Sequence, residues 1–321
     1  MIKFGVVGSG WIAEEFVKGA KLVDGFVFSA MYSRTYEKGK AFAEKFGDVP
    51  VYTDINDFAK SDIDAVYIAS PNSLHYSQSK LMLENGKHVL CEKPITITPE
   101  EFIELSSLAE SKNLVYTEAI MMLHLSQRKV IKEKLKALGN VSTAHFDFSQ
   151  LSSKYPALIR GENPNIFNPA MKTGCLRDLG IYCFYPAIDF FGIPEKIISS
   201  AGFLSTGADG YGTAILDYAD KQITLTYSKI GQDFSGSQII GDKGTMTFGS
   251  ISKLTDVEIY YNDGSKEKLV GEIEKHILMS EEAKDFCEYI STKDNNLSEV
   301  NSKVLSVVEL MNTVIKQCNI I

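Results

Sequence analysis

Cysteine is scarce in this 321-residue sequence, and its five copies form no C-x-x-C pair. Scattered cysteines in a long chain predict reduced thiols rather than a disulfide framework. The five histidines likewise stand at no spacing that is typical of metal ligands. We therefore expect neither disulfide bonds nor a metal site.

Long apolar runs and basic runs are missing as well. No stretch approaches the roughly 18 apolar residues of a membrane span, and the N-terminal segment does not resemble a signal peptide, which predicts a cytoplasmic protein. The 41 acidic residues outnumber the 33 basic ones, for a formal net charge of -8. This balance argues against nucleic acid or a membrane as a partner, because both bind clustered lysine and arginine. The remaining composition, 44% hydrophobic, suits about two globular domains.

Residues 1–120 alternate between strand-like and helix-like segments. The strand-like runs are residues 2–7, 26–32, 65–69, 88–91 and 114–117, and the helix-like stretches are residues 37–46, 73–84 and 99–111. Strands separated by single helices are typical of parallel βαβ units. We expect an α/β domain with a doubly wound parallel sheet, in which Asp54 and Thr98 cap the helices that follow them.

Residues 121–321 have a different rhythm. Short β-rich runs occupy residues 141–150, 196–204, 212–218, 222–228, 237–240, 244–248 and 257–261, and helix-like stretches occupy residues 127–138, 175–191, 281–290 and 302–316. Tight turns between successive runs favour antiparallel hairpins. This part predicts a second, α+β domain with one open, mostly antiparallel sheet.

A glycine-rich turn follows the first strand and opens the first helix. Its sequence is Gly8-Ser9-Gly10-Trp11-Ile12-Ala13. Gly8 suits the tight turn, Gly10 lets a pyrophosphate approach the backbone, and a small residue at 13 lets helix and strand pack closely. We interpret this segment as the phosphate-binding turn of a dinucleotide site, the alternative being a tight turn with a purely structural role.

The residues after the second strand bear on the choice between NAD and NADP. An acidic residue there would bind the ribose 2′-hydroxyl group of NAD. This sequence has Ser33-Arg34-Thr35 instead. A guanidinium group between two hydroxyl groups suits a 2′-phosphate, so NADP is favoured over NAD as the cofactor. The alternative is that Arg34 stacks on the adenine or is solvated.

Two polar segments come at the carboxyl ends of later strands, the sheet edge at which ligands of such sheets bind. They are Ser70-Pro71-Asn72-Ser73-Leu74-His75 and Cys91-Glu92-Lys93-Pro94. We assign Ser70, Asn72, His75, Glu92 and Lys93 to the cofactor site. Because Lys93 precedes a proline, its backbone is restricted to extended or turn conformations, which directs its ammonium group. The alternatives are a helix-capping role for His75 and an exposed surface position for Lys93.

Read together, these motifs identify a family resemblance. The run Glu84-x-Gly86-Lys87-His88-Val89-Leu90-Cys91-Glu92-Lys93-Pro94 and the second signature Gly174-x-x-x-Asp178-Leu179-Gly180-Ile181-Tyr182 resemble the glucose–fructose oxidoreductase, inositol dehydrogenase and MocA (Gfo/Idh/MocA) family. The resemblance implies a Rossmann domain and an α/β domain whose open sheet forms a homodimer or homotetramer. It further implies NAD(P)-dependent oxidation or reduction of a small substrate, a sugar, polyol or related diol, with Lys93 as the functional lysine.

Tyr182 points to one branch of that family. Many members have histidine four residues after the signature Asp178, whereas tyrosine resembles the dihydrodiol and aldose (xylose-type) dehydrogenase branch, in which it is the acid/base. Residues i and i+4 share one face of a helix, and a nearby ammonium group lowers the pKa of a phenol. We therefore predict that Tyr182, assisted by Lys93, takes the hydroxyl proton while a hydride passes to the nicotinamide, and that Asp178 orients the pair or the substrate. The alternative is that Tyr182 is only a half-buried aromatic residue.

Two departures from the family pattern lie near the expected substrate site. Lys172-Thr173 stands where relatives often have glycines, and Arg177 replaces a residue that is usually apolar. Arg177 is expected to be a solvated helix residue or, alternatively, a ligand of an anionic substrate. Two other functions stay open: a non-catalytic dinucleotide-binding sensor or regulator, and a glycosidase-like enzyme that uses NAD without net redox change.

Overall fold

The computed structural model describes residues 1–292 and 295–321, which divide by their contacts into two compact units. Unit 1 consists of Met1–His124 and Glu274–Leu305, and unit 2 consists of Leu125–Ile273 and Ser306–Ile321. The first boundary lies close to the one expected after residue 120. The return of Glu274–Leu305 to unit 1 has no counterpart in the sequence interpretation.

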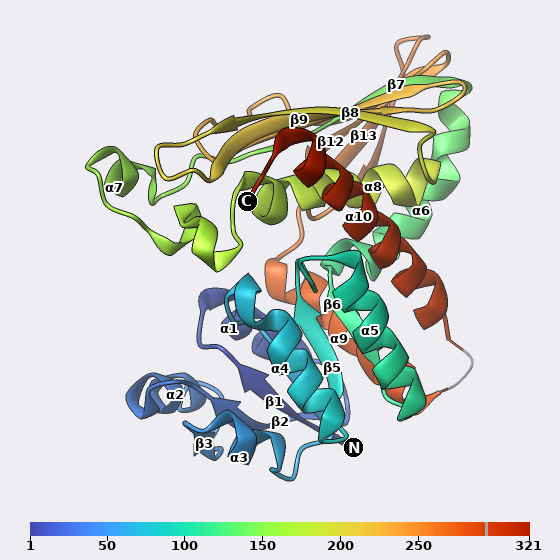
Figure 1. Ribbon diagram of the computed structural model, residues 1–321. Helices are drawn as coiled ribbons and strands as arrows, with labels where there is room; N and C mark the ends of the chain where they lie inside the picture. The colour runs from blue at the N-terminus through green and yellow to red at the C-terminus, as the bar shows by residue number, and fades with distance from the viewer. Residues whose placement is uncertain (293–294) are drawn as a thin grey trace. The chain divides into compact units, whose positions relative to one another are not determined.

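Unit 1 is built on a six-stranded parallel sheet with the strand order β3-β2-β1-β4-β5-β6, which confirms the doubly wound α/β fold (Figure 1). The strands are β1 (Ile2–Val7), β2 (Phe26–Tyr32), β3 (Val51–Tyr52), β4 (Ala65–Ile68), β5 (His88–Glu92) and β6 (Tyr116–Ala119). The helices are α1 (Trp11–Ala20), α2 (Tyr36–Ala43), α3 (Ile55–Ala59), α4 (Asn72–Glu84), α5 (Pro99–Ser111), the 3-10 turn Met121–Leu123 and α9 (Lys275–Ser291). The carboxyl ends of these parallel strands meet at one edge of the sheet, where the turns and loops of the site begin.

Both predicted helix caps of unit 1 are confirmed. The side chain of Asp54 accepts hydrogen bonds from two backbone N–H groups of α3. At α5, the Thr98 hydroxyl accepts from the Glu101 N–H group at 3.3 Å, and the Glu101 carboxylate accepts from the Thr98 N–H group at 3.3 Å. This capping box satisfies backbone donors that the first helical turn would otherwise leave without a partner.

Helix α9 packs closely on α1, although the sequence around residues 281–288 reads as an acidic, solvated helix face. The two helices meet at Gly19, where a Cβ atom would lie 2.6 Å from the His276 carbonyl oxygen. Glu282, also on α9, is only 1% exposed, so this residue does not belong to a solvated face. Burial and the neighbouring Glu92 raise the pKa of Glu282 well above its usual range.

Unit 2 is built on an eight-stranded sheet with the order β14-β13-β12-β11-β7-β10-β9-β8. The strands are β7 (Val141–Ser149), β8 (Lys196–Phe203), β9 (Asp209–Asp217), β10 (Gln222–Ser228), β11 (Ser237–Gly241), β12 (Gly244–Ser250), β13 (Thr255–Tyr261) and β14 (Lys266–Val270). Neighbouring strands are antiparallel except β7 and β10, which confirms the expected open, mostly antiparallel sheet.

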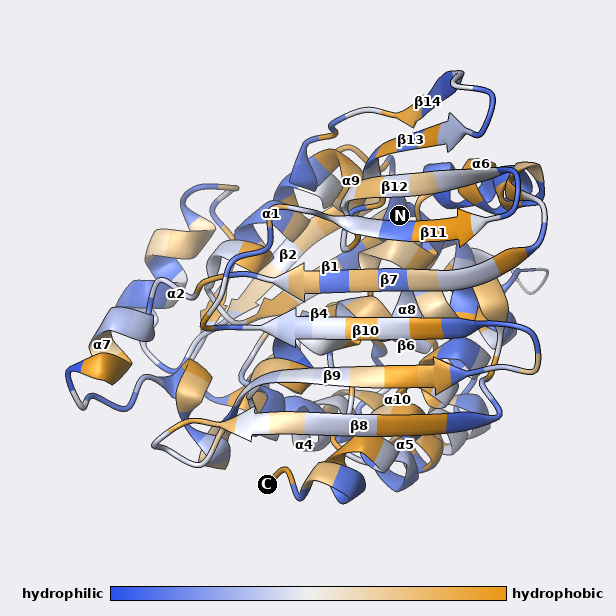
Figure 2. Ribbon diagram, turned by 90° about the horizontal axis from the view of Figure 1, so that it is seen from above, coloured by the Kyte–Doolittle hydropathy of each residue, from blue (hydrophilic) through white to orange (hydrophobic). Residues whose placement is uncertain are grey.

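Helices cover one face of this sheet. They are α6 (Ser126–Lys134) with the 3-10 turn Leu135–Leu138, the π-helix Leu176–Gly180 and α8 (Ile181–Phe191). The short helix α7 (Tyr155–Ile159) lies in a long loop with two further 3-10 turns. The residues of α10 (Leu297–Cys318) are divided between the two units. Along β10 the alternate residues Ile223, Leu225 and Tyr227 are buried on the covered face. Figure 2 shows the other face, on which none of the described helices of unit 2 lies. In the same described part, no helix is long and apolar enough to cross a bilayer.

Candidate active site

A cavity of about 890 Å³ opens in unit 1 where β1, β2 and β4 end. Of the predicted cofactor residues, Gly8, Ser33, Arg34 and Ser70 line it. The other lining residues are Val7, Ser9, Tyr32, Thr35, Lys38, Ile55, Ala69, Pro71, Leu74, Ser77, Gln78 and Leu81. The turn after β1 and the segment after β2 are thus brought together, as a dinucleotide site requires.

The two glycines of the turn after β1 differ in what they accommodate. Gly8 has a φ of +106°, and a Cβ atom there would lie 2.3 Å from the Ala69 carbonyl oxygen, so the fold itself requires glycine. Gly10 has a φ of -79°, and a Cβ atom there would meet nothing within 4 Å among the described residues. Open space therefore lies before the first N–H groups of α1, which suits the pyrophosphate of a dinucleotide.

The end of the cavity after β2 is cationic. Arg34 is exposed there, and Lys38 in the first turn of α2 also lines the cavity. A lysine opposes the helix dipole at that position, which is unfavourable unless an anion binds nearby. The sequence interpretation missed Lys38, although its place four residues after Arg34 at a helix start was a usable signal.

Trp11 and Ile12 begin α1 beside this cavity but do not line it. The Trp11 side chain is exposed, and the Lys275 ammonium group lies 5.8 Å from its ring centroid. Ile12 is half-buried. Their contact with a cofactor stays a prediction.

His75 holds two loops of the site together. Its ring is buried, with Nδ1 at 2.8 Å from the Pro94 carbonyl oxygen and Nε2 at 2.8 Å from the Ser70 carbonyl oxygen. Burial lowers the pKa of the imidazole, although the two carbonyl groups oppose the shift. Because both ring nitrogens face protein carbonyl groups, we expect His75 to act on a cofactor through the loops it joins. Asn72 is the first residue of α4, on the loop after β4.

Lys93 follows β5 and is half-buried, beside two carboxylates that support its loop. The Glu92 side chain accepts a hydrogen bond from the Tyr67 hydroxyl group and another from the Lys93 N–H group at 3.3 Å. Burial raises the pKa of Glu92, which the Tyr67 hydroxyl and the Lys93 ammonium group partly offset. The fully buried Glu118, from β6, accepts from the Ile95 N–H group at 2.6 Å. This scaffold places Lys93 at the carboxyl edge of the sheet.

The second signature lies in unit 2, on the π-helix and the start of α8. Gly174, before the π-helix, has a φ of +116°, and a Cβ atom there would lie 2.0 Å from Asp209 Oδ1. The Asp209 carboxylate in turn accepts from the Leu176 N–H group at 2.6 Å. Gly180 packs on the ring of Tyr227 in β10, where a Cβ atom at residue 180 would lie 3.0 Å from Tyr227 Cδ1. The start of this helical segment is therefore fixed at both ends of the π-turn.

Asp178 and Tyr182 are the half-exposed residues of a segment that is otherwise buried. Every other residue from 174 to 189 is buried. The helix face that Asp178 and Tyr182 were expected to share is therefore the only accessible face of this described segment. The Tyr182 ring packs edge-on against Phe148 of β7, with the centroids 5.2 Å apart. This contact holds the ring while part of it stays accessible.

Lys229 is a member of this group that the sequence interpretation missed. Its Nζ lies 3.0 Å from Asp178 Oδ2, and its side chain is 1% exposed. A usable signal existed, because Ile223, Leu225 and Tyr227 point to the covered face of the sheet and residue 229 continues that alternation. A lysine at an inward-facing position needs a partner.

Arg177 is not the solvated residue that we expected. It is 4% exposed, and its Nη1 donates to the Ile321 carbonyl oxygen at 3.0 Å. Burial lowers the pKa of this guanidinium group, and the buried Asp209 opposes that shift. The π-helix directs residue 177 into the protein while residue 178 stays accessible. The Lys172 backbone adopts the left-handed conformation, with a φ of 51°.

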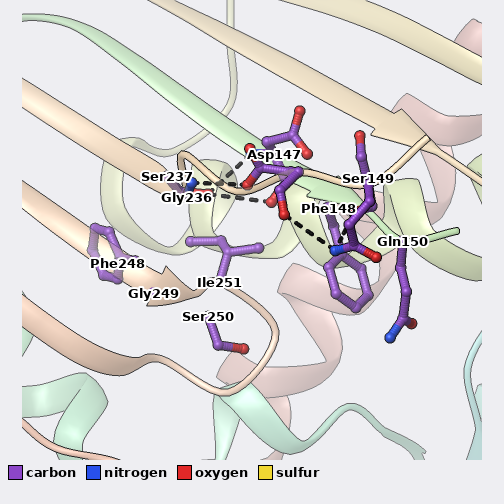
Figure 3. Close-up of a pocket in the computed structure, with 12 residues that line it drawn as sticks. Asp147, Phe148, Ser149, Gln150, Gly236, Ser237, Phe248, Gly249, Ser250 and Ile251 are labelled. Atoms are coloured by element: carbon purple, nitrogen blue, oxygen red, sulfur yellow. Dashed lines mark hydrogen bonds between the residues drawn. The ribbon is translucent and has the colours of Figure 1, made fainter.

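A second, smaller hollow of about 100 Å³ lies at the end of β7 (Figure 3). Its lining includes Asp147 and Asp233, and none of the predicted site residues. The Asp233 carboxylate accepts from the N–H groups of Ser235 and Gly236 at 2.7 and 2.8 Å, so it is used within its own loop. Burial raises the pKa of Asp147. Phe148, which packs on the Tyr182 ring, also lines this hollow, so the hollow adjoins the second signature.

Comparison with known proteins bears on both units. The family described as "Oxidoreductase family, NAD-binding Rossmann fold" matches residues 2–120, and the GFO/IDH/MocA C-terminal domain matches residues 127–247. The scyllo-inositol 2-dehydrogenase (NADP(+)) of Bacillus subtilis is 37% identical, over 100% of this chain and 98% of that protein. The chain belongs to the Gfo/Idh/MocA family of oxidoreductases. The family resemblance is thereby confirmed, as is the NAD-binding Rossmann domain.

More distant relatives have related activities. A trans-1,2-dihydrobenzene-1,2-diol dehydrogenase of Mus musculus is 29% identical over 83% of this chain and 79% of that protein. The 3-ketoreductase KijD10 of Actinomadura kijaniata, solved with NADP and TDP-benzene, matches with a TM-score of 0.86 at 21% identity, over 99% of this chain and 98% of that chain. At this identity the structural match supports the fold alone. Together with the family match, the sequence relatives make this protein an oxidoreductase of the type that acts on CH–OH groups.

Proposed function

We propose that this protein is an NADP-dependent dehydrogenase that oxidises a secondary hydroxyl group of a sugar, polyol or dihydrodiol. The observation that carries the proposal is the pair Asp178 and Tyr182, left accessible on a helical segment whose other residues are buried. A phenol and a carboxylate in such a place are suited to acid/base work on a hydroxyl group. Unit 1 supplies the cavity for the dinucleotide.

NADP is the cofactor that the cavity favours. Arg34 and Lys38 place two cations at the end of the cavity after β2, without an acidic partner for a ribose 2′-hydroxyl among its described lining residues. Cations at this position suit a 2′-phosphate. The scyllo-inositol dehydrogenase relative is also named for NADP. A bound nicotinamide would supply the hydride acceptor.

In the reaction that we propose, Tyr182 takes the proton of the substrate hydroxyl group. The ammonium group of Lys93 assists by favouring the phenolate form. Asp178 accepts a hydrogen bond from the substrate and orients it, and Phe148 holds the Tyr182 ring at its edge. Gly10 leaves the N–H groups at the start of α1 open to the pyrophosphate, and Ser70 belongs to the cavity wall.

The open face of the unit 2 sheet is proposed to form a homodimer or homotetramer. Ile198 and Phe203 of β8 and Tyr211 of β9 are about half exposed on this domain. Exposed apolar side chains on a sheet are typical of interfaces between subunits. Light scattering during gel filtration would test this part, and a monomer at micromolar concentration would contradict it.

Oxidation of a substrate panel tests the proposed function. Inositols, aldoses and a trans-dihydrodiol are incubated with the protein and NADP, and NADPH formation is followed at 340 nm by absorbance. We expect turnover of at least one of them, with kcat reduced by about 100-fold or more in Tyr182→Phe and in Lys93→Ala. Both variants should still bind NADPH. Near-normal turnover in both variants would refute the assignment, and NADPH binding without turnover of any hydroxyl substrate would favour a sensor.

A further inference from the structure

Lys229 is a buried cation that none of the proposed catalytic steps uses. It follows β10, and its Nζ lies 3.0 Å from Asp178 Oδ2. The Lys229 side chain is 1% exposed, whereas that of Asp178 is 31% exposed. The pair therefore has a buried cationic end and an accessible anionic end.

The surroundings of the ammonium group hold it in place. Its Nζ donates to the Ile166 carbonyl oxygen at 3.3 Å and lies 5.9 Å from the centroid of the buried Phe167 ring. The Lys229 backbone is bonded on both sides, to the Gly210 carbonyl oxygen and from the Ser152 N–H group, each at 2.9 Å. A lysine with this many contacts has lost most of the freedom of its side chain. Its charge is therefore directed at one carboxylate oxygen.

We propose that Lys229 is a positioning residue, which holds the Asp178 carboxylate ionised and oriented toward the substrate. The inference rests on the proposed function, because it assigns Asp178 a contact with the substrate hydroxyl. An ammonium group at this distance favours the charged form of a carboxylate. Lys229 itself is too deeply buried to touch a substrate, so it acts through Asp178.

The pair also limits the class of substrate. An ionised carboxylate only accepts hydrogen bonds, so the group that meets Asp178 has to be a donor such as a hydroxyl. The Arg177 guanidinium next to it in sequence is turned inward onto the Ile321 carbonyl oxygen. Because no cation of residues 176–180 is exposed, this segment favours a neutral polyhydroxyl substrate over a phosphorylated one.

A double-mutant cycle between Lys229 and Asp178 tests the inference. The variants Lys229→Met, Asp178→Asn and the double variant are compared with the wild type by kcat/KM on a substrate found in the panel. We expect each single variant to lose about 10- to 100-fold, the range typical of a charged hydrogen bond. The double variant should be no worse than Asp178→Asn, because Lys229 acts only through that carboxylate. Lys229→Arg should recover a large part of the activity.

The control is Lys221→Met, in the same hairpin at the opposite end of β10. Among the contacts described, the Lys221 side chain pairs only with the neighbouring, exposed Asp220. We therefore expect the Lys221→Met substitution to leave kcat/KM unchanged. The dissociation constant of NADPH should be the same in all variants, because the cavity belongs to unit 1.

Two results would overturn the inference alone. The first is a Lys229→Met variant with wild-type kcat/KM. The second is a double variant in which the two single losses multiply, because the effect of Lys229 would then not depend on residue 178. If Lys229→Met fails to fold, the comparison of Asp178→Asn with the double variant still decides. Asp178→Asn keeps a side-chain oxygen for the Lys229 ammonium group, and the double variant removes both charges, so neither leaves a charged Asp178 unpaired. A wild-type protein that binds NADPH but oxidises no hydroxyl substrate would instead refute the proposed function, and the inference with it.

Discussion

The cationic end of the nucleotide cavity makes the cofactor preference a quantitative prediction. Arg34 and Lys38 line this end, and both are exposed. We predict that Arg34→Ala and Lys38→Ala each weaken NADPH binding while NADH binding changes less than about twofold. The 2′-phosphate is the difference between the two cofactors, so a residue that contacts it affects only NADPH.

The size of the effect follows from exposure. A hydrogen bond between charged groups contributes most when it is buried, and solvent reduces it at the surface. We therefore take the lower end of the usual range, about tenfold in the NADPH dissociation constant for each cation. The double variant should lose about 100-fold if the two cations contact the phosphate independently. Its NADPH affinity should also fall less steeply with added salt, because two screened charges have been removed.

Quenching or enhancement of NADPH and NADH fluorescence during titration would measure these constants. Lys40→Ala is a matched control, because Lys40 lies on the same helix, pairs with Asp48 at 3.1 Å and does not line the cavity. Its NADPH preference should equal that of the wild type. The assignment would be refuted by equal binding of the two cofactors to the wild type, or by a loss of NADH affinity as large as that of NADPH affinity.

Three further predictions concern stability and binding. Gly10→Ala should fold with nearly wild-type stability in urea, since a Cβ atom there has no described atom within 4 Å, but should weaken binding of both cofactors measurably; unchanged binding would contradict the phosphate assignment. Gly174→Ala should lower the free energy of unfolding by about 2 kcal/mol or more, because the backbone is left-handed and Asp209 fills the space; an effect below 0.5 kcal/mol would contradict it. The raised pKa of Glu282 means that its contribution to stability is present below about pH 4.5 and lost as the pH rises toward its folded-state value. Glu282→Gln should therefore gain up to about 1.4 kcal/mol over the wild type per pH unit above pH 4.5, measured by urea unfolding at pH 5, 6 and 7, whereas a constant difference would refute this reasoning.

The parallel sheet could be predicted from the sequence because buried strands read as uninterrupted apolar runs. All four residues of β4 are buried, and β1 is buried along its last four residues. Strand β14 was not expected, since its sequence Lys-Glu-Lys-Leu-Val is mostly charged and its only neighbour in the sheet is β13. An edge strand half in solvent has no apolar pattern to detect.

Residues whose burial depends on tertiary packing were harder to predict than residues whose position follows from the end of a nearby strand. Arg34 and Lys93 lie within two residues of the end of a strand, so the sheet edge determines where they lie. Glu282 and Arg177 sit on helices whose buried sides depend on partners distant in sequence, namely α1 and Ile321. The π-helix Leu176–Gly180 made the burial of Arg177 harder still to predict, because it changes which residues of the segment face inward. Its amino-acid composition does not distinguish it from an α-helix.

Lys229 and Asp178 also weigh against a role limited to sensing a dinucleotide. Taking an ammonium group out of water carries a penalty of several kcal/mol, and an apolar pair of similar volume in its place is often neutral or stabilising. Neither residue lines the cavity of unit 1, so binding a nucleotide there gives no reason to keep them. A sensor could fill the same space with apolar side chains and become more stable. The charged pair Lys229 and Asp178 lies where a buried segment is accessible, and the Tyr182 phenol lies on the same segment. This arrangement is expected of a catalytic site.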